Sequence, residues 1–149
     1  MTSIRAYATQ DDDDIIAVWE AVSRLAHPFL SEDFIASERT AIRDIYLPNT
    51  ITYVAEDDGR VVGFTSLIGD EVGAIFVLPE LHGKGLGRAL MDSASKGKDF
   101  LEVEVFEKNN IGRPFYESYG FEELKRSVHE ATGERLIRMR WSLAESKKA

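Results

Sequence analysis

Hydrophobic residues recur at helical spacing in two segments of the first third of the chain. The first segment predicts a helix that begins with Asp11–Asp14 and ends near His27 and Pro28. Thr9 is a candidate N-cap for this helix. Its apolar positions are Ile15, Val18, Trp19, Val22, Leu25 and Ala26. Ser31 is a candidate N-cap for a second helix, which Pro48 and Asn49 should end. The apolar side of that helix is Phe34, Ile35, Ile42, Ile45 and Tyr46.

Stretches rich in β-branched and aromatic residues predict seven strands. They cover residues 4–7, 52–56, 61–68, 72–77, 100–106, 122–128 and 135–143. The turn residues 57–60 and 69–70 are typical of β-hairpins and join three consecutive strands. In the last strand, Ile137, Met139, Trp141 and Leu143 alternate with polar residues, which indicates one buried face.

Two further helices are expected between the later strands. One follows the glycines at 83–87, has Leu86, Leu90 and Ala94 on its apolar face, and ends before Gly97. The other begins near Asn110 and ends at Tyr119 and Gly120. The order of elements predicts an α/β (α+β) fold, with a mixed, mostly antiparallel central sheet of about seven strands flanked by about four helices. We expect a single domain over residues 1–149, with residues 144–149 as a frayed tail.

The composition narrows the class of protein. Of the 149 residues 44% are hydrophobic and 30% charged, the balance of a globular chain rather than a disordered one. No apolar run approaches the ~18 residues that a membrane span needs, and residues 1–10 contain no signal-peptide core. The absence of cysteine excludes disulfides, thiolate zinc sites and a cysteine nucleophile. With only three scattered histidines, we expect a cytoplasmic protein without a metal site.

Charge is distributed unevenly along the chain. Residues 1–80 contain five Lys or Arg and fifteen Asp or Glu, a net charge of −10, whereas residues 81–149 carry +2. This balance disfavours nucleic acid as a partner, because clustered basic residues supply most of that affinity. It suits a cationic amine ligand, although a solvated acidic surface would give the same pattern.

The segment richest in candidate chemistry is residues 75–91, IFVLPELHGKGLGRALM. Glycines at alternate positions allow a sharp turn and close approach of a ligand to the peptide N–H groups. Because the loop leads into a helix, unpaired amides and the positive end of the helix dipole could bind phosphate. The sequence fits neither a Walker loop nor the dinucleotide-binding fingerprint, and an ordinary glycine-rich turn remains the alternative.

Two motifs resemble those of a known family. Residues 82–87, HGKGLG, resemble the Arg/Gln-x-x-Gly-x-Gly/Ala motif of the GNAT superfamily of acyl-CoA-dependent N-acetyltransferases, with His82 where Arg or Gln is usual. Residues 109–121 resemble its Asn-x-x-Ala-x-x-Phe-Tyr-x-x-x-Gly-Phe pattern, with Gly112 in place of Ala. The order of elements also matches over residues 4–143. Residues 25–31 and the hairpin before Glu71 are most similar to the small bacterial YjaB-type subgroup.

The resemblance implies acetyl-CoA or CoA as the cofactor. Its pyrophosphate would lie on the loop amides, and its pantetheine arm would pair with the backbone of the preceding strand. The residues implied are Ile75, Phe76, Val77, His82, Gly83, Lys84, Gly85, Leu86, Gly87, Arg88, Asn109 and Tyr116. For Asn109, a purely structural helix cap is an equal alternative.

Acyl transfer to an amine also needs proton transfers. By its position in the family motif, Tyr116 would donate a proton to the leaving thiolate, with packing against Phe115 and Phe121 as the alternative. Glu71 is the candidate base, unless it is only an exposed turn residue. The acceptor pocket is expected among the N-terminal helices, lined by His27, Phe29, Leu30 and Tyr46.

The expected function is an acetyl-CoA-dependent N-acetyltransferase that acts on a primary amine of a small molecule or of a protein or peptide. A non-catalytic acyl-CoA-binding or sensing module is the alternative, because it would keep the glycine loop without needing Tyr116 or a base. The acidic balance counts against a third candidate, an acetyltransferase acting on aminoacyl-tRNA. We expect no nucleic-acid or membrane partner, and a monomer or homodimer.

Overall fold

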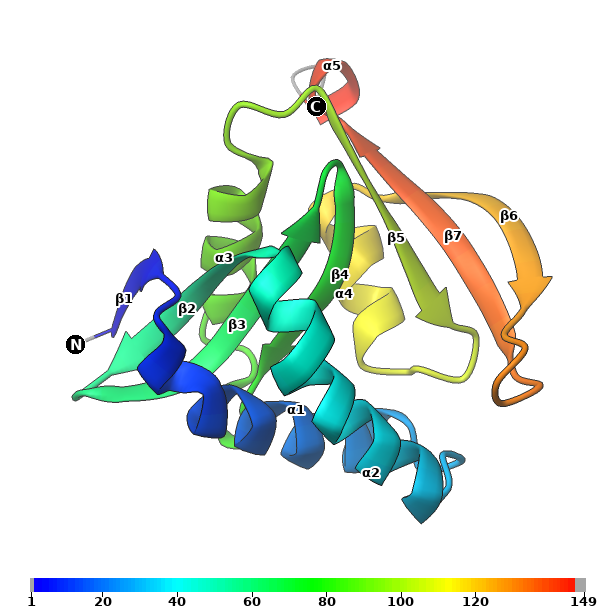
Figure 1. The fold of residues 1–149 in the computed structure, drawn as a ribbon. Coiled ribbons are helices and arrows are strands. Elements are labelled where there is room, and N and C mark those ends of the chain that lie inside the picture. The colour runs from blue at the N-terminus through cyan, green and yellow to red at the C-terminus, as the bar shows by residue number, and fades with distance from the viewer. Residues whose placement is uncertain (1, 147–149) are drawn as a thin grey trace.

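The computed structural model describes residues 2–146, which contain one seven-stranded sheet (Figure 1). The strands are β1 (Thr2–Ala6), β2 (Ile51–Asp57), β3 (Arg60–Ile68), β4 (Glu71–Val77), β5 (Phe100–Phe106), β6 (Glu122–Val128) and β7 (Arg135–Ser142). Their order across the sheet is β1-β2-β3-β4-β5-β7-β6, and every neighbouring pair is antiparallel except β4 and β5. The predicted mixed, mostly antiparallel sheet is confirmed.

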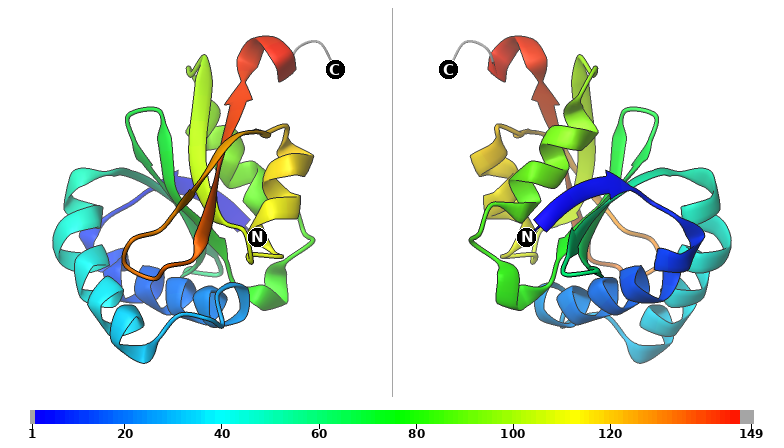
Figure 2. Two further views of the ribbon diagram at one scale, coloured as in Figure 1. Left: turned by 90° about the vertical axis from the view of Figure 1, so that its right-hand side faces the viewer. Right: turned by 90° about the vertical axis from the view of Figure 1, so that its left-hand side faces the viewer.

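Helices cover both faces of this sheet. They are α1 (Asp12–Ala26), α2 (Glu32–Ala41), α3 (Leu86–Ser95), α4 (Gly112–Tyr119) and the short α5 (Leu143–Ser146). Figure 2 shows α1 and α2 on one side of the sheet and α3 and α4 on the other. Ile15 and Val18 of α1 pack with Phe64 of β3, while Met91 of α3 and Leu101 of β5 belong to a second buried cluster. The sheet therefore separates two apolar layers.

The first helix begins differently from the prediction. Thr9 lies in a 3-10 turn (Thr9–Asp11) and caps nothing; the buried residue at this point is Asp11. The Asp11 carboxylate accepts a hydrogen bond from the Ala8 N–H at 2.8 Å and two from the Arg5 guanidinium at 2.9 Å. A carboxylate that neutralises a neighbouring guanidinium and holds the turn thus takes the place of a Thr cap.

The second helix starts as predicted but changes its pitch. The Ser31 hydroxyl accepts a hydrogen bond from the Phe34 N–H at 3.1 Å, an N-cap. After Ala41 the chain continues as a π-helix over Ile42–Tyr46 and then a 3-10 turn over Leu47–Asn49. The wider π turn rotates the later residues away from the helical register, which leaves Ile45 57% exposed instead of on the apolar side.

The described part of the chain ends in a short helix. Residues 143–146 form α5, which overlaps the start of the tail expected to fray over residues 144–149. The Leu143 N–H donates to the Asp99 carbonyl at 2.8 Å, which ties the start of this turn to the chain before β5. Residues 147–149 lie outside the described residues.

The only parallel pair in the described sheet opens into a gap. β4 and β5 pair at Glu71–Glu102 and Val72–Val103 and then separate, as Figure 1 shows. A β-bulge lies at the same point, because Leu67 pairs with Val72 and Ser66 with Ala74, which leaves Gly73 unpaired. The bulge bends β4 away from β5, so the strand edge beyond it has no neighbour in the sheet.

Candidate active site

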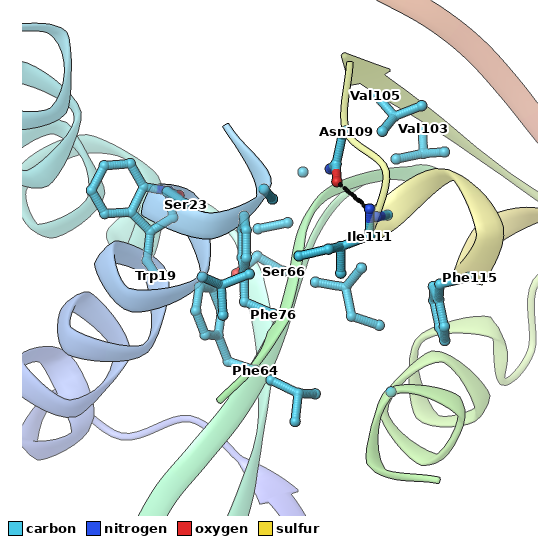
Figure 3. Close-up of a pocket in the computed structure, with 18 of the residues that line it drawn as sticks. Trp19, Ser23, Phe64, Ser66, Phe76, Val103, Val105, Asn109, Ile111 and Phe115 are labelled. Carbon is cyan, nitrogen blue, oxygen red and sulfur yellow. Dashed lines mark hydrogen bonds between the residues drawn. The ribbon is translucent and has the colours of Figure 1, made fainter. Parts of the chain in front are cut away.

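A cavity of about 700 Å³ runs through the gap between β4 and β5. It is lined from the α1 and α2 side and also from the α3 and α4 side of the sheet. Figure 3 shows Trp19, Phe64 and Phe76 on one side of the strands and Ile111 and Phe115 on the other. A ligand that spans the sheet could therefore reach both the glycine loop and the N-terminal helices.

The glycine loop ends at the N-terminus of α3. Gly83 and Gly85 adopt φ angles of +80° and +84°, a left-handed conformation that strains any other L residue. Helical hydrogen bonding starts with the Ala89 N–H and the Gly85 carbonyl, 3.0 Å apart, so the amides of residues 86–88 precede the first intrahelical donor. A Cβ on Gly83 or Gly85 would meet no atom within 4 Å, which leaves open space beside the loop. This loop fits a diphosphate.

The open edge of β4 offers backbone groups to the gap. The Leu78 N–H donates to the Val62 carbonyl at 2.9 Å, so Leu78 and, by alternation, Phe76 point their peptide groups toward β3. The peptide groups of Ile75 and Val77 consequently point toward the gap. His82 Nε2 donates to the Val77 carbonyl at 2.6 Å and fixes the loop to the strand end. Within residues 2–146 no strand pairs with this part of the β4 edge, so the N–H and C=O of Ile75 and the N–H of Val77 can pair with an extended amide-bearing arm.

The structure brings nearly all predicted cofactor residues to this cavity. Its lining includes Ile75, Phe76, Val77, His82, Gly83, Gly85, Leu86, Gly87, Arg88, Asn109 and Tyr116. Lys84 is exposed and does not line the cavity. The Arg88 guanidinium lies 5.1 Å from the centre of the Tyr119 ring, which keeps its charge beside the loop.

Tyr116 lies at the junction of the cavity and the core. Its ring makes edge-to-face contacts with Phe115 and Phe121 at centroid distances of 5.6 and 5.4 Å. Within residues 2–146 its hydroxyl has no hydrogen-bond partner, and burial raises the pKa of the phenol above its ordinary value. The packing of Tyr116 against Phe115 and Phe121 is confirmed, and because Tyr116 also lines the cavity, its role as the acid stays a prediction.

Asn109 caps α4 from the cavity wall. Its Oδ1 accepts hydrogen bonds from the N–H groups of Ile111 and Gly112 at 3.1 and 2.7 Å (Figure 3 shows the first). A Cβ on Gly112 would lie 2.6 Å from Asn109 Nδ2, so glycine at this position makes room for the cap. In this structure the Asn109 amide therefore occupies the space that an Ala Cβ at position 112 would need, and the capping role of Asn109 is confirmed.

Glu71 is held away from the cavity. Its Oε1 accepts a hydrogen bond from Arg138 Nη2 at 2.8 Å, and Arg138 also pairs with Glu102 at 2.6 Å and Glu104 at 3.4 Å. Glu71 is absent from the cavity lining, whereas Glu104 is present. A carboxylate bound to a guanidinium at the paired end of β4 is poorly placed to take a proton from an acceptor, so the geometry disfavours Glu71 as the base.

The acceptor side of the cavity combines predicted and unpredicted residues. His27, Leu30 and Tyr46 line the cavity, and burial lowers the pKa of His27 to about 4, so its imidazole is neutral. Phe29 does not line it and packs instead against His27 and Phe106.

Sequence reasoning missed several residues on this wall, three of them aromatic or charged residues that bear on acceptor binding. Phe34 and Glu38 of α2 and His129 after β6 line the cavity, and the rings of Phe34 and His129 lie 5.9 Å apart. The repeat of Phe34, Glu38 and Ile42 every four residues on one helix face was available in the sequence. The position of His129 next to Phe34 could not be predicted from the sequence, because it depends on the path of the β6–β7 hairpin.

Among residues 2–146 no three His, Cys, Asp or Glu side chains are grouped so that they could hold a metal ion. Over the same range no helix is long and apolar enough to cross a lipid bilayer.

Comparison with known proteins identifies the family. The profile of the acetyltransferase (GNAT) domain matches residues 48–123, which include the glycine loop, Asn109 and Tyr116. The chain belongs to the GNAT acetyltransferase family. The predicted superfamily is thereby confirmed.

Curated relatives cover most of the chain. Peptidyl-lysine N-acetyltransferase YiaC of Escherichia coli is 33% identical over 108 residues, covering 72% of this chain and 74% of its own. Peptidyl-lysine N-acetyltransferase YjaB of E. coli is 30% identical over 135 residues, covering 88% and 89%. The predicted similarity to the YjaB type is confirmed.

Solved structures agree with this GNAT assignment. The solution structure of apo YjaB from E. coli superposes with a TM-score of 0.84 at 28% identity, covering 95% of this chain and 97% of that one. PaiA N-acetyltransferase from Thermoplasma acidophilum, solved in complex with coenzyme A, gives a TM-score of 0.72 at 19% identity, covering 95% and 99%. At that identity the second structure shows that the fold is shared.

Proposed function

We propose that this GNAT enzyme transfers the acetyl group of acetyl-CoA to the ε-amino group of lysine side chains in proteins or peptides. The observation that carries the proposal is the continuous cavity, which joins a diphosphate-binding loop on one side of the sheet to an acceptor wall on the other. The lysine acceptor is supported by the names of the relatives YiaC and YjaB, both peptidyl-lysine N-acetyltransferases.

Different residues along the cavity would bind different parts of acetyl-CoA. When bound, acetyl-CoA supplies a thioester whose carbonyl carbon is activated toward amines. The loop amides of residues 83–88 would hold its diphosphate. The Ile75 and Val77 peptide groups would align its arm, and one of their N–H groups would donate to the carbonyl oxygen. Asn109 keeps the start of α4, and with it Tyr116, in place.

Two proton transfers remain. Tyr116 would donate its phenolic proton to the departing sulfur, since a phenol is protonated at neutral pH and burial raises its pKa further. The acceptor amine must lose a proton before it attacks, and the carboxylates that line the cavity are Glu38 and Glu104. Glu104 also pairs with Arg138, at 3.4 Å, as Glu71 does at 2.8 Å, so we favour Glu38 for interaction with the amine.

Substitution of Tyr116 tests the chemistry. Tyr116→Phe removes only the hydroxyl, which has no partner among residues 2–146, so the fold should be kept while turnover of a lysine peptide falls about 100-fold or more. Coenzyme A affinity, measured by calorimetry, should change less than about threefold. Tyr119→Phe is the matched control, because its hydroxyl bonds Asp92 and Ser95 rather than facing the reaction. Equal turnover in the wild type and Tyr116→Phe would exclude the acid role.

The same assay addresses the sensing alternative. If coenzyme A raises the thermal midpoint of unfolding while no amine is acetylated, the chain binds acyl-CoA without catalysis. A cytoplasmic location, a monomeric or homodimeric state and the absence of a nucleic-acid partner remain predictions from the sequence.

A further inference from the structure

Glu38 differs from the other carboxylates near the cavity. Glu71, Glu102 and Glu104 all pair with Arg138. Glu38, on the inner face of α2, has no Lys, Arg or His partner within 4 Å anywhere in residues 2–146, and its one side-chain hydrogen bond comes from the Tyr46 hydroxyl at 3.4 Å. The cavity wall therefore presents one carboxylate whose charge is not neutralised by a basic side chain.

The surroundings of Glu38 are aromatic. Phe34 lies one helical turn before Glu38. The His129 ring, just after β6, packs against the rings of Phe34 and Phe106, with ring centroids 5.9 and 5.3 Å apart. Burial raises the pKa of Glu38, against the opposing effects of the Tyr46 hydrogen bond and the His129 charge. A half-buried carboxylate without an ion-pair partner costs free energy, which a cationic ligand would recover.

We infer that Glu38 binds the ammonium group of the acceptor, so that it is the residue that selects an alkylammonium side chain at this site. The inference rests on the proposed lysine acetyltransferase function. An alkylammonium ion has an apolar stem and one charged end, and the wall offers aromatic rings for the stem and a carboxylate for the charge. Tyr46 is a positioning residue, because its hydroxyl reaches Glu38 from the π-helix that follows α2.

The test compares Glu38→Gln with Asp33→Asn. Both changes remove one negative charge from α2, but Asp33 is exposed and does not line the cavity. Glu38→Gln should raise KM for a lysine peptide and for n-butylamine about tenfold or more, because a charge-assisted hydrogen bond is lost. KM for acetyl-CoA should stay within about twofold, and Asp33→Asn should leave both constants at the wild-type values.

Stability separates a ligand-binding role from a structural one. Since Glu38 makes no ion pair in the described fold, Glu38→Gln should leave the thermal midpoint unchanged or raise it. A lowered midpoint together with unchanged KM values for both amines would overturn the inference, because Glu38 would then act only in the fold.

A binding measurement gives a second, independent outcome. In the presence of coenzyme A, the wild type should bind a lysine peptide more tightly than the same peptide with norleucine, and Glu38→Gln should lose that preference. If the preference survives, Glu38 does not recognise the ammonium. If n-butylamine shows the Glu38 effect but no lysine peptide is acetylated, the inference about Glu38 stands and the protein acceptor of the proposed function fails.

Discussion

Replacing Gly112 with alanine should reveal how Asn109 is held at the start of α4. The backbone of Gly112 is helical, so alanine itself introduces no backbone strain. Its Cβ, however, would lie 2.6 Å from Asn109 Nδ2 and 3.1 Å from Asn109 Cγ. The side chain of Asn109 would have to rotate away and give up its hydrogen bonds to the N–H groups of Ile111 and Gly112.

The magnitude follows from the bonds that are lost. Two hydrogen bonds contribute about 1 kcal/mol each, and the buried amide of Asn109 is left without partners. Alanine recovers at most about 1 kcal/mol through its higher helix propensity. We therefore expect Gly112→Ala to lower the free energy of unfolding by about 2 kcal/mol and the thermal midpoint by about 4–8 °C.

A double-mutant cycle isolates the steric cause. In the Asn109→Ala background there is no side-chain amide to displace, so adding Gly112→Ala should stabilise the protein by up to about 1 kcal/mol. Urea denaturation of the four proteins measures the four free energies of unfolding. The reasoning is refuted if Gly112→Ala changes the free energy of unfolding by the same amount and in the same direction in both backgrounds, because the effect would then not depend on Asn109.

The remaining predictions concern acid stability and cofactor binding. Because burial lowers the folded-state pKa of His27 from 6.5 to about 4, the unfolded state binds the proton more readily, and stability should fall by up to about 3 kcal/mol as the pH drops from 6.5 to 4. Urea denaturation at several pH values should show this slope in the wild type and a flatter one in His27→Gln; equal slopes would contradict the assignment. Gly85→Ala and Gly69→Ala both place a side chain at positive φ with open space around it, so both should cost about 1 kcal/mol or more. Only Gly85→Ala should also reduce the rise in thermal midpoint that coenzyme A produces, and a similar loss in Gly69→Ala would argue against binding at the loop.

Much of the candidate site could be predicted because its signals are local. The conformation of Gly85 is required by the turn that precedes α3, whatever the rest of the chain does. The same holds for the cap of α4, where Asn109 acts on residues two and three positions later. Tyr116 lies on α4, whose register its own segment defines, and it lines the cavity. Motif recognition therefore selected residues that the fold brings to one cavity.

The structure adds most where partners are distant in sequence. The Glu71 carboxylate is bound by Arg138, which follows 67 residues later on β7, so its own segment gives no sign of this pairing. Glu38 and His129 line the same cavity from α2 and from the end of β6, so no sequence spacing relates them. Ile45 was assigned to an apolar face that the π turn rotates outward.

Local signals were sufficient to predict most helices and strands, the hairpins and the loop that begins α3, because alternation, capping and glycine conformation act over a few residues. The packing of distant segments settled that β4 and β5 separate after two paired residues and that the resulting cavity crosses the sheet. The same packing settled which carboxylates form ion pairs, since Arg138 reaches three of them, whereas Glu38 has no ion pair within 4 Å in the described residues. Ion pairing depends on the distance between two charged side chains in the folded protein, and that distance cannot be read from their separation in the sequence.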